Sequence, residues 1–447
     1  MASILDRERI VAGPGHSRWL VPPAALAVHL CIGQAYGFSV FNLPLTRVIG
    51  ISQSAPDDWK LTSVALIFGV AIVFLGLSAA VFGAWLERVG PRKAMFASAC
   101  CFGGGFLVSA LGVKVHFFPL TLLGYGVLGG IGLGLGYISP VSTLIKWFPD
   151  RPGMATGMAI MGFGGGALIG SPLGVNLMKL YSSPTSVGVV ETFVTMGVAY
   201  FAFMMFGAFT VRVPPPGWKP EGWTPPPVKQ KLVTSANVTV SNAVRTPQFY
   251  LLWGVLFLNV SAGIGVLQTA SPMIQQTVGV SAASAAGFVG LLSLFNMGGR
   301  FFWSSLSDKL GRKPIYAIYF AFGGLLYALV PKAAGMHSVP LFVAIVCVII
   351  SMYGAGFATI PAYLRDLFGT VQVGAIHGRL LTAWSAAGVV GPLLINFMRD
   401  YQVAHGVPLA RSYDRTMYIL VGFLVLGFIC NALVKPVDPR FHERTAP

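Results

Sequence analysis

Long apolar stretches separated by short polar segments run through most of this chain. A helix needs about 20 apolar residues to cross a hydrocarbon core about 30 Å thick, and twelve stretches are of this kind. The predicted spans are 20–41, 61–82, 94–113, 118–140, 154–178, 192–211, 249–270, 282–306, 315–330, 339–361, 374–397 and 417–434. Only 10% of the 447 residues are charged, against about 25% in soluble domains. The pattern predicts an all-α protein embedded in a lipid bilayer.

A proline-rich segment divides these spans into two sets of six. It includes the sequence Val213-Pro-Pro-Pro-Gly-Trp-Lys-Pro-Glu-Gly-Trp-Thr-Pro-Pro-Pro, and proline runs favour extended, semi-rigid chain over helix. We therefore expect an N-terminal half at 1–211, a cytoplasmic linker at 212–247 and a C-terminal half at 248–447.

The two halves repeat one another at an offset of 221 residues. The matching residues are Glu87-Arg88-Val89-Gly90 with Asp308-Lys309-Leu310-Gly311, Pro140 with Pro361, Gly153 with Gly374, and Gly157 with Gly378. Three helix regions that agree on one offset predict two parallel six-helix pseudo-repeats, an architecture in which substrates bind near the membrane midplane. Glycines at four-residue spacing, at 126, 130 and 134 and again at 162, 166 and 170, predict helices that approach closely.

The net charge of +16 is distributed over alternate loops rather than gathered on one face, which argues against nucleic-acid binding. The termini and the loops on their side carry 21 of the 30 lysines and arginines, the opposite loops carry 8, and one lies within a span. Basic loops stay in the cytoplasm. We expect both termini to be cytoplasmic in the plasma (inner) membrane.

The basic residue inside a span is Arg300. It lies eight residues before Asp308, about 12 Å along a helix, and a guanidinium at that depth costs at least about 2.5–3.5 kcal/mol. All 14 acidic residues fall outside the predicted spans or at helix ends. We infer that a small anionic substrate in a central cavity supplies the counter-charge. A structural role, by snorkelling or by donation to helix-terminal carbonyls or Asn296, remains open.

Two loops carry a more specific signal. The sequences Trp85-Leu-Glu-Arg-Val-Gly-Pro-Arg-Lys and Leu306-Ser-Asp-Lys-Leu-Gly-Arg-Lys resemble the acidic, basic, glycine, basic signature of the major facilitator superfamily. A carboxylate near a helix end and basic residues in a glycine turn can latch adjacent helices. The resemblance implies a cytoplasmic gate made of Glu87, Arg88, Gly90, Arg92, Asp308, Lys309, Gly311 and Arg312.

Further motifs narrow the resemblance to the oxalate/formate antiporter and monocarboxylate transporter group. They are Ile32-Gly-Gln-Ala-Tyr-Gly-Phe-Ser-Val-Phe, Gly129-Gly-Ile-Gly-Leu-Gly-Leu-Gly-Tyr-Ile-Ser-Pro with Trp147-Phe-Pro-Asp, Ile160-Met-Gly-Phe-Gly-Gly-Gly-Ala and the stretch 296–303. In that group an arginine in helix eight grips the substrate carboxylate, and Arg300 matches it. Tyr353 and Phe357 resemble the aromatic pair that lines the group's pocket, although packing between helices explains such a pair equally.

The chain departs from the oxalate exchanger in helix eleven. That protein has a lysine there, whereas this chain has Trp384 at the matching position and no Lys or Arg from 380 to 398. One cation suits one carboxylate, so a monocarboxylate such as lactate, pyruvate or formate is favoured over oxalate.

Several other polar side chains are candidates for the site. Tyr125, Tyr137, Gln34 and Tyr36 can donate to substrate oxygens, or can instead bond neighbouring helices. We place His29 as the one titratable group besides Arg300 well inside a span, where it can carry a proton or hold a structural hydrogen bond.

The sequence thus favours a secondary active transporter of small monocarboxylates that works by alternating access, as a monomer. Its partners are a small carboxylate anion and either a co-transported proton or an exchanged anion. The alternatives are a dicarboxylate exchanger of the oxalate/formate type and, in a different class, an anion-binding membrane sensor. We expect no enzymatic activity, no cofactor and no metal, because no nucleophile–base pair and no metal-ligand cluster is visible.

Overall fold

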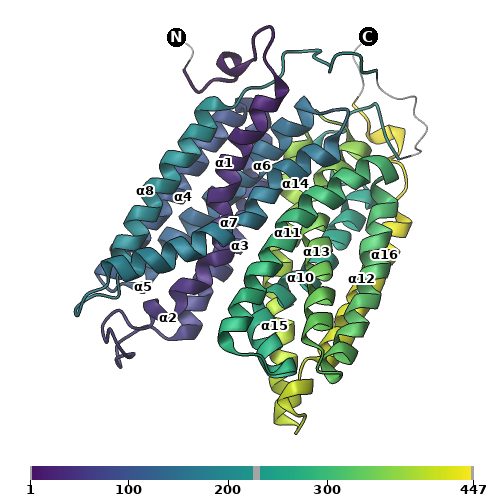
Figure 1. The fold of residues 1–447 in the computed structure, drawn as a ribbon. Helices are drawn as coiled ribbons and strands as arrows, with labels where there is room; N and C mark the ends of the chain where they lie inside the picture. Colours follow the sequence, from purple (N-terminus) through teal and green to yellow (C-terminus); the bar gives the residue numbers. More distant parts are fainter. Residues whose placement is uncertain (1–2, 225–231, 444–447) are drawn as a thin grey trace. The chain divides into compact units, whose positions relative to one another are not determined.

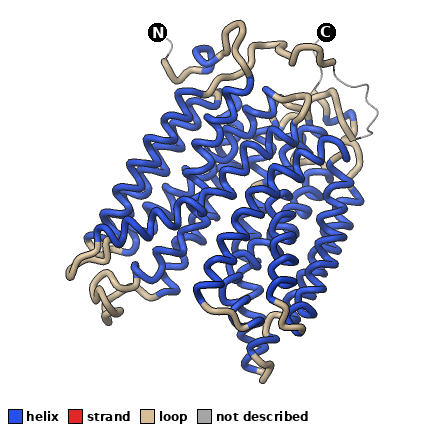
Figure 2. Tube along the Cα trace, viewed as in Figure 1, coloured by secondary structure: helices blue, strands red, loops and turns tan. Residues whose placement is uncertain are grey.

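The computed structural model describes residues 3–224 and 232–443 and consists of helices joined by loops (Figures 1 and 2). Within these ranges the β features are isolated bridges, such as Val11 with Val213. Residues 225–231 of the predicted linker lie outside the described residues. All twelve predicted spans are helical.

Most helices extend beyond their predicted limits. The α-helices are α1 (Val21–Ile32), α2 (Asn42–Leu45), α3 (Leu61–Val89), α4 (Pro91–Lys114), α5 (Phe118–Thr121), α6 (Gly130–Trp147), α7 (Pro152–Tyr181), α8 (Val189–Thr210), α9 (Val240–Ala243), α10 (Pro247–Val278), α11 (Ala282–Leu310), α12 (Arg312–Gly335), α13 (Val339–Phe368), α14 (Val373–Leu380), α15 (Thr382–Ala404) and α16 (Asp414–Leu433). The first predicted span continues from α1 into the 3-10 helix η3 (Gly33–Phe41), and the fourth contains the π-helix η4 (Leu122–Gly129).

In the described residues, eleven helical segments are long and apolar enough to cross a membrane. A further helix, α11, contains Arg300. It is 29 residues long, or about 43 Å at a rise of 1.5 Å per residue. Only helices satisfy every backbone polar group within one segment, as the hydrocarbon core requires. The protein is therefore an all-α integral membrane protein, as predicted.

Glycine and proline fix two equivalent helix boundaries. Gly90 ends α3 at a φ of +87°, and Gly311 ends α11 at a φ of +89°. These angles are in the region that residues with a Cβ rarely adopt. Pro91, the first residue of α4, needs no hydrogen-bonded N–H at that position. The predicted repeat thus recurs in the backbone at the same offset.

The chain forms two compact units. The first consists of Met1–Asp150, Gly162–Thr224 and Gly374–Ser385, and the second of Arg151–Met161, Pro225–Val373 and Ala386–Pro447.

In the first unit, the two glycine ladders lie where helices approach closely. A Cβ on Gly130 would lie 2.8 Å from the carbonyl oxygen of Ala71 on α3, and one on Gly166 would lie 2.6 Å from that of Leu30 on α1. Because no larger residue fits at these distances, the ladders set the packing of α6 on α3 and of α7 on α1. The predicted role of the ladders is confirmed.

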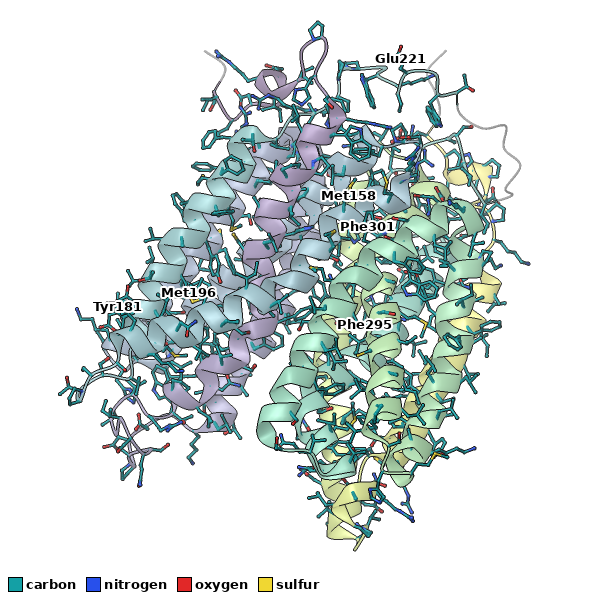
Figure 3. The ribbon with its side chains drawn as sticks, viewed as in Figure 1. Met158, Tyr181, Met196, Glu221, Phe295 and Phe301 are labelled. Carbon is teal, nitrogen blue, oxygen red and sulfur yellow. The ribbon has the colours of Figure 1, made fainter. Side chains whose placement is uncertain are left out.

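In the second unit, α11 packs against α13, and α12 packs against α16. Figure 3 marks Phe295 and Phe301 on α11, whose rings are exposed. Asn296 and Arg300, on the same helix, are buried. The helix therefore presents an apolar face outward and carries its polar side chains inward.

Candidate functional site

Arg300 is fully buried on α11, with 0% of its surface exposed. Its Nε donates to Oδ1 of Asn296 one turn earlier at 3.1 Å, and its Nη1 donates to the carbonyl oxygen of Ile160 at 3.2 Å. Donation to Asn296 is one of the structural roles that the sequence left open for Arg300. Both acceptors are neutral, so these two bonds orient the guanidinium without cancelling its charge.

Two glycines make room for this arrangement. A Cβ on Gly354 of α13 would lie 2.7 Å from the carbonyl oxygen of Asn296 and 3.1 Å from Cγ of Arg300. A Cβ on Gly299 of α11 would lie 2.6 Å from Cα of Ser351 on α13. Each helix thus supplies a glycine where the backbone of the other passes. The close approach of α11 to α13 fixes where the arginine side chain lies.

An aromatic pair on α13 lies beside the arginine. The guanidinium carbon of Arg300 is 5.6 Å from the ring centroid of Phe357, a cation–π distance. The rings of Tyr353 and Phe357 are 5.7 Å apart in an edge-to-face arrangement. The structure thus brings three predicted site residues of the second unit together.

Four aromatic rings cluster in the first unit. Trp384 is fully buried, and its ring centroid lies 5.2 Å from Phe163, 5.1 Å from Tyr137 and 6.4 Å from Tyr36. We define these four residues as the aromatic cluster. Sequence reasoning did not include Phe163, because a phenylalanine in an apolar helix carries no signal of its own.

Two other predicted donors pair with each other. The hydroxyl of Tyr125, on η4, donates to Oε1 of Gln34, on η3, at 3.0 Å. Tyr125 is completely enclosed and packs on Phe38 at 4.3 Å. This pair joins two non-α segments of the first unit.

His29 is buried on α1, where its Nε2 lies 3.1 Å from the carbonyl oxygen of Tyr137. His377 on α14 is also buried, with 1% exposed. The sequence placed His377 near the end of its span. Only the packing around α14 encloses it.

α14 ends at Leu380 and α15 begins at Thr382, so Trp384 lies within one turn of this boundary. The N–H of Leu381 donates to the carbonyl oxygen of His377, and the N–H of Ser385 donates to that of Leu381, so Val373–Ala404 is one continuous helical span. π-helical stretches such as η4 are frequent at functional sites.

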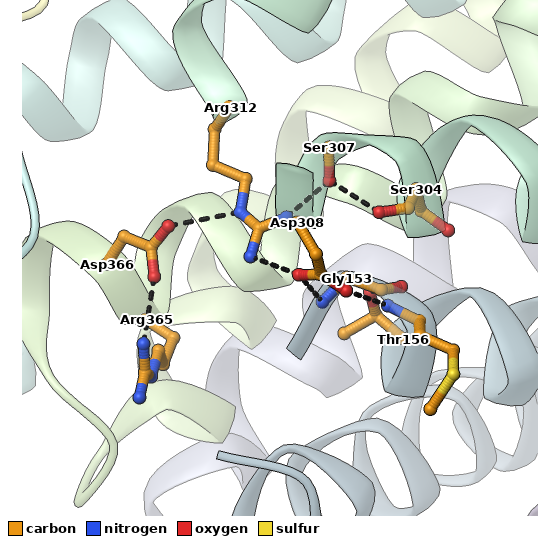
Figure 4. Close-up of polar contacts among 9 residues, drawn as sticks. Gly153, Thr156, Ser304, Ser307, Asp308, Arg312, Arg365 and Asp366 are labelled. Atoms are coloured by element: carbon orange, nitrogen blue, oxygen red, sulfur yellow. Dashed lines mark hydrogen bonds and ion pairs between the residues drawn. The ribbon is translucent and has the colours of Figure 1, made fainter. Parts of the chain in front are cut away.

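Two predicted gate residues of the second unit, Asp308 and Arg312, belong to a continuous network of polar contacts (Figure 4). The carboxylate of Asp308 accepts the N–H groups of Gly153 and Met154, each at 2.8 Å, and pairs with Arg312 at 2.7 Å. Arg312 also pairs with Asp366 at 3.0 Å. The carboxylate therefore sits at the N-terminus of α7, where the helix dipole favours negative charge.

The first unit repeats this contact at the same offset. Oε1 of Glu87 accepts the N–H of Gly374, beside the N-terminus of α14, at 2.9 Å, and Oε2 pairs with Lys146 at 2.6 Å. Glu87 matches Asp308, and Gly374 matches Gly153, under the predicted repeat. Each acidic residue of the two loop motifs thus caps the start of a helix.

Two basic residues of the motifs, Arg92 and Lys313, have a separate role. Arg92 donates to the carbonyl oxygens of Ala208 and Phe209, at 3.2 and 2.9 Å, at the end of α8. Lys313, its counterpart under the repeat, donates to those of Ala432 and Val434 at the end of α16, at 2.7 and 2.8 Å. Both cations satisfy helix-terminal carbonyls. By contrast, Arg88 and Lys309 are exposed.

A cavity of about 340 Å³ lies beside the network in the second unit, lined by residues that include Leu232, Leu310, Arg312, Tyr363 and Asp366. Of its lining charges, Arg312 and Asp366 pair with each other, and Nζ of Lys313 donates to the carbonyl oxygens of Ala432 and Val434. The cavity therefore offers an apolar surface rather than an anion site.

One acidic residue outside the spans organises the loop before α3. Oδ1 of Asp58 accepts the N–H of Ile49 at 2.9 Å, while Oδ2 accepts those of Gly50 at 3.0 Å and Ala55 at 2.8 Å. Burial raises the pKa of this carboxyl, but the three N–H groups and nearby His116 outweigh that effect and lower the pKa below its usual value.

The fold and these residues define a class of protein, a polytopic helical membrane protein with a buried cation and repeated helix-capping loops. The family model of the Major Facilitator Superfamily matches residues 24–392 and, in a second match, 301–447. The chain belongs to this superfamily of membrane transporters.

Its relatives include proteins of the predicted group. The chain is 27% identical to the oxalate:formate antiporter of Oxalobacter formigenes over 428 residues, which cover 95% of this chain and 92% of that protein. It is 26% identical to monocarboxylate transporter 11 of Homo sapiens over 414 residues, covering 87% of this chain and 79% of that protein. These relatives confirm the resemblance to this group.

The fold is also that of a solved superfamily member. The crystal structure of FucP in the outward conformation matches with a TM-score of 0.65 at 14% identity, covering 93% of this chain and 99% of that chain. At this identity the likeness concerns the fold alone.

Proposed function

We propose that this chain is a secondary active transporter of small monocarboxylates, in which Arg300 pairs the substrate carboxylate. The proposed substrates are of the lactate, pyruvate and formate class. The protein works by alternating access in the plasma membrane, as a monomer with both termini cytoplasmic.

The complete burial of Arg300 is the observation that carries this proposal. A charged guanidinium inside a membrane helix costs at least about 2.5–3.5 kcal/mol, and such charges mark substrate or ion pathways. Asn296 and the carbonyl of Ile160 hold the side chain in a defined direction. A preorganised guanidinium can form two parallel hydrogen bonds with one carboxylate, which matches the chemistry named by both relatives.

The aromatic residues favour a substrate with one carboxylate and an apolar remainder. Phe357 lies under the guanidinium, and Tyr353 packs on Phe357. Trp384 stands at the position where the oxalate exchanger has a lysine, within the aromatic cluster. An apolar ring at that position offers nothing to pair with a second carboxylate, whose desolvation would be uncompensated.

A dicarboxylate exchanger is the second candidate function. The observation that favours it is the relation to the oxalate:formate antiporter over 95% of the chain. An anion sensor that does not transport is a third, since binding at Arg300 alone would satisfy it. Unlabelled mono- and dicarboxylates of one to four carbons can be tested as competitors of labelled lactate in a counterflow assay. Their order of potency distinguishes a monocarboxylate transporter from a dicarboxylate exchanger, and any counterflow at all rejects the sensor.

The capped helix ends support a gate on the cytoplasmic side. Glu87 holds the start of α14 through Gly374, and Asp308 holds the start of α7 through Gly153. We propose that these carboxylates leave the helix N-termini when access changes from one side of the membrane to the other. Each carboxylate is held there by a few hydrogen bonds, which water can replace.

Substitution of Arg300 in purified, reconstituted protein tests the proposal. Arg300→Gln should abolish lactate counterflow. Arg300→Lys should retain a weak activity, because lysine keeps the charge but lacks the planar, bidentate fork. Arg245→Gln, at an exposed arginine in the loop before α10, is the matched control. Near-normal counterflow in a folded Arg300→Gln protein would reject Arg300 as the carboxylate site.

A further inference from the structure

Asn259 is a buried amide that the proposed carboxylate site does not use. It lies on α10, in the second unit, with 5% of its surface exposed. Within the part of the chain that the structure describes, its Oδ1 is buried without a hydrogen-bond partner. A buried acceptor without a donor is costly in a native protein and calls for an explanation.

Asn259 lies at about the same depth in its helix bundle as Arg300. It follows Pro247, where α10 begins, by twelve residues, or about 18 Å. Arg300 precedes Leu310, where α11 ends, by ten residues, or about 15 Å. Because consecutive spans run in opposite directions, both distances start from the same face of the membrane. The amide and the guanidinium are therefore at a similar level on two helices that contact each other.

The helix α13 meets both polar side chains at a glycine. A Cβ on Gly356 would lie 2.9 Å from Cγ of Asn259, and one on Gly354 would lie 3.1 Å from Cγ of Arg300. At about 100° per residue, these two contacts lie on opposite sides of the helix face that carries Tyr353 and Phe357. The aromatic pair therefore stands between the amide and the guanidinium.

The two rings reach the helices on both sides. A Cβ on Gly263 of α10, one turn after Asn259, would lie 2.6 Å from Cβ of Tyr353. The guanidinium carbon of Arg300 is 5.6 Å from the ring centroid of Phe357. The second unit thus presents a cation, an apolar pair of rings and an unpaired acceptor in succession.

We propose that Asn259 determines specificity by accepting a hydrogen bond from the 2-hydroxyl group of the substrate. The carboxylate pairs with Arg300, the carbon chain packs on the aromatic rings, and the hydroxyl donates to Oδ1 of Asn259. The preferred substrates are then 2-hydroxy monocarboxylates. The inference rests on the proposed function, since it names the substrate class of that same site.

This role explains the unpaired acceptor. A site that is built to bond a hydroxyl group rejects an analogue without one, because its buried polar atom then stays unpaired. An apolar residue at the same position would bind the hydroxylated and the plain acid alike. The amide therefore provides selectivity that the guanidinium cannot provide, since every monocarboxylate offers the same carboxylate.

Two pairs of competitors in the lactate counterflow assay test the inference. Lactate and propionate differ by one hydroxyl group, as do glycolate and acetate, and all four are anions at neutral pH. One hydrogen bond corresponds to about 2- to 12-fold in affinity, so in wild type the hydroxy acid of each pair should be the stronger inhibitor by this factor. Asn259→Leu, which replaces the amide with an apolar group of similar size, should bring both ratios to about one. Inhibition by propionate and acetate should stay within about threefold of wild type.

The matched control is Thr269→Val, on the same helix. Thr269 is also 5% exposed, but its hydroxyl donates to the carbonyl oxygen of Gly265 in its own helix at 2.9 Å. This variant should keep both ratios of wild type. Should Asn259→Leu not fold, Asn259→Ala removes the amide without adding bulk beside Gly356, and the same two ratios are measured.

The outcomes separate this inference from the carboxylate proposal. Unchanged ratios in Asn259→Leu, or no preference within either pair in wild type, would overturn the role of Asn259 and leave the carboxylate proposal intact. An equal loss of inhibition by all four acids would overturn it as well, since the amide would then support the packing of the whole site. Absence of lactate counterflow in wild type would overturn the proposed function, and this inference with it.

Discussion

Substitution of Gly354 tests how the packing of α11 on α13 positions Arg300. The new methyl group of Gly354→Ala would lie 2.7 Å from the carbonyl oxygen of Asn296 and 3.1 Å from Cγ of Arg300. Ordinary contacts of this kind are about 3.5–4.0 Å. The two helices must therefore separate, or the arginine must turn, by several tenths of an ångström or more.

The expected loss follows from the cost of overpacking. Extra methyl groups in a well-packed interior cost about 1–3 kcal/mol. If the protein relieves the clash by moving the guanidinium, the binding free energy of lactate weakens by a similar amount, about 1–3 kcal/mol. A loss of about 1.4 kcal/mol lowers the affinity tenfold. The KM for lactate should rise about 5- to 150-fold. Folding stability should change less, because alanine favours a helix over glycine by about 1 kcal/mol.

The control for this substitution is on the same helix as the arginine. Gly298→Ala makes the same chemical change at an exposed position where nothing lies within 4 Å of the new Cβ. Its KM should equal that of wild type in the same counterflow assay, with unfolding temperatures measured for both variants. A wild-type KM for Gly354→Ala would refute the reasoning, since Arg300 would then bind carboxylate independently of the contact, or not at all.

Three further substitutions have defined outcomes. Arg92→Gln removes the cation that caps α8 and should lower the free energy of unfolding by about 2 kcal/mol. The control is Lys93→Gln, which removes a half-exposed ion pair with Asp6 at 3.8 Å and should change the free energy of unfolding by less than about 0.5 kcal/mol. Equal melting temperatures for the two variants would contradict the capping role. The lowered pKa of Asp58 means that its contribution to the loop is full above the unfolded pKa of about 3.9 and is lost as pH falls through the lower folded value. The protection factors of residues 46–60, which compare each exchange rate with its intrinsic rate at the same pH, should therefore fall only below about pH 4, and Asp58→Asn should show low protection at every pH; a loss of protection near pH 6 in wild type would be evidence against it. Trp384→Lys should raise the affinity for oxalate in competition assays, and an unchanged order of competitors would reject the assigned helix-eleven position.

Much of the fold was predictable because the bilayer imposes simple rules on a sequence. Every predicted span is a helix, since a long apolar stretch has no other way to satisfy its backbone in hydrocarbon. The boundaries at Gly90 and Gly311 follow from local chemistry, namely a positive φ that glycine accepts. The repeat was visible because Glu87 and Asp308 stand at matching positions.

The candidate site was only partly predictable. Arg300 was found from the cost of its charge alone, and that argument needs no neighbours. Its hydrogen-bond partners could be predicted only in part. Asn296 is one turn earlier on the same helix, whereas the carbonyl of Ile160 is 140 residues away in the sequence. Because every residue has a backbone carbonyl, nothing in the sequence distinguishes that of Ile160. His377 was missed because its sequence position near a span end gives no measure of its burial.

The sequence by itself therefore determined which segments form long apolar helices, that the halves repeat, and which cation lies within such a helix, although most helices extend beyond their predicted limits. Tertiary structure alone decided that His29 and His377 both pack on Tyr137, that Trp384 packs on Tyr137 and Phe163, and that Glu87 caps the helix at Gly374. The physical reason is that a membrane helix is apolar on all sides, so its hydrophobic pattern does not reveal which face meets a neighbour. That choice is made by the packing of side chains, above all at glycines such as Gly354, and it appears only when the helices are assembled.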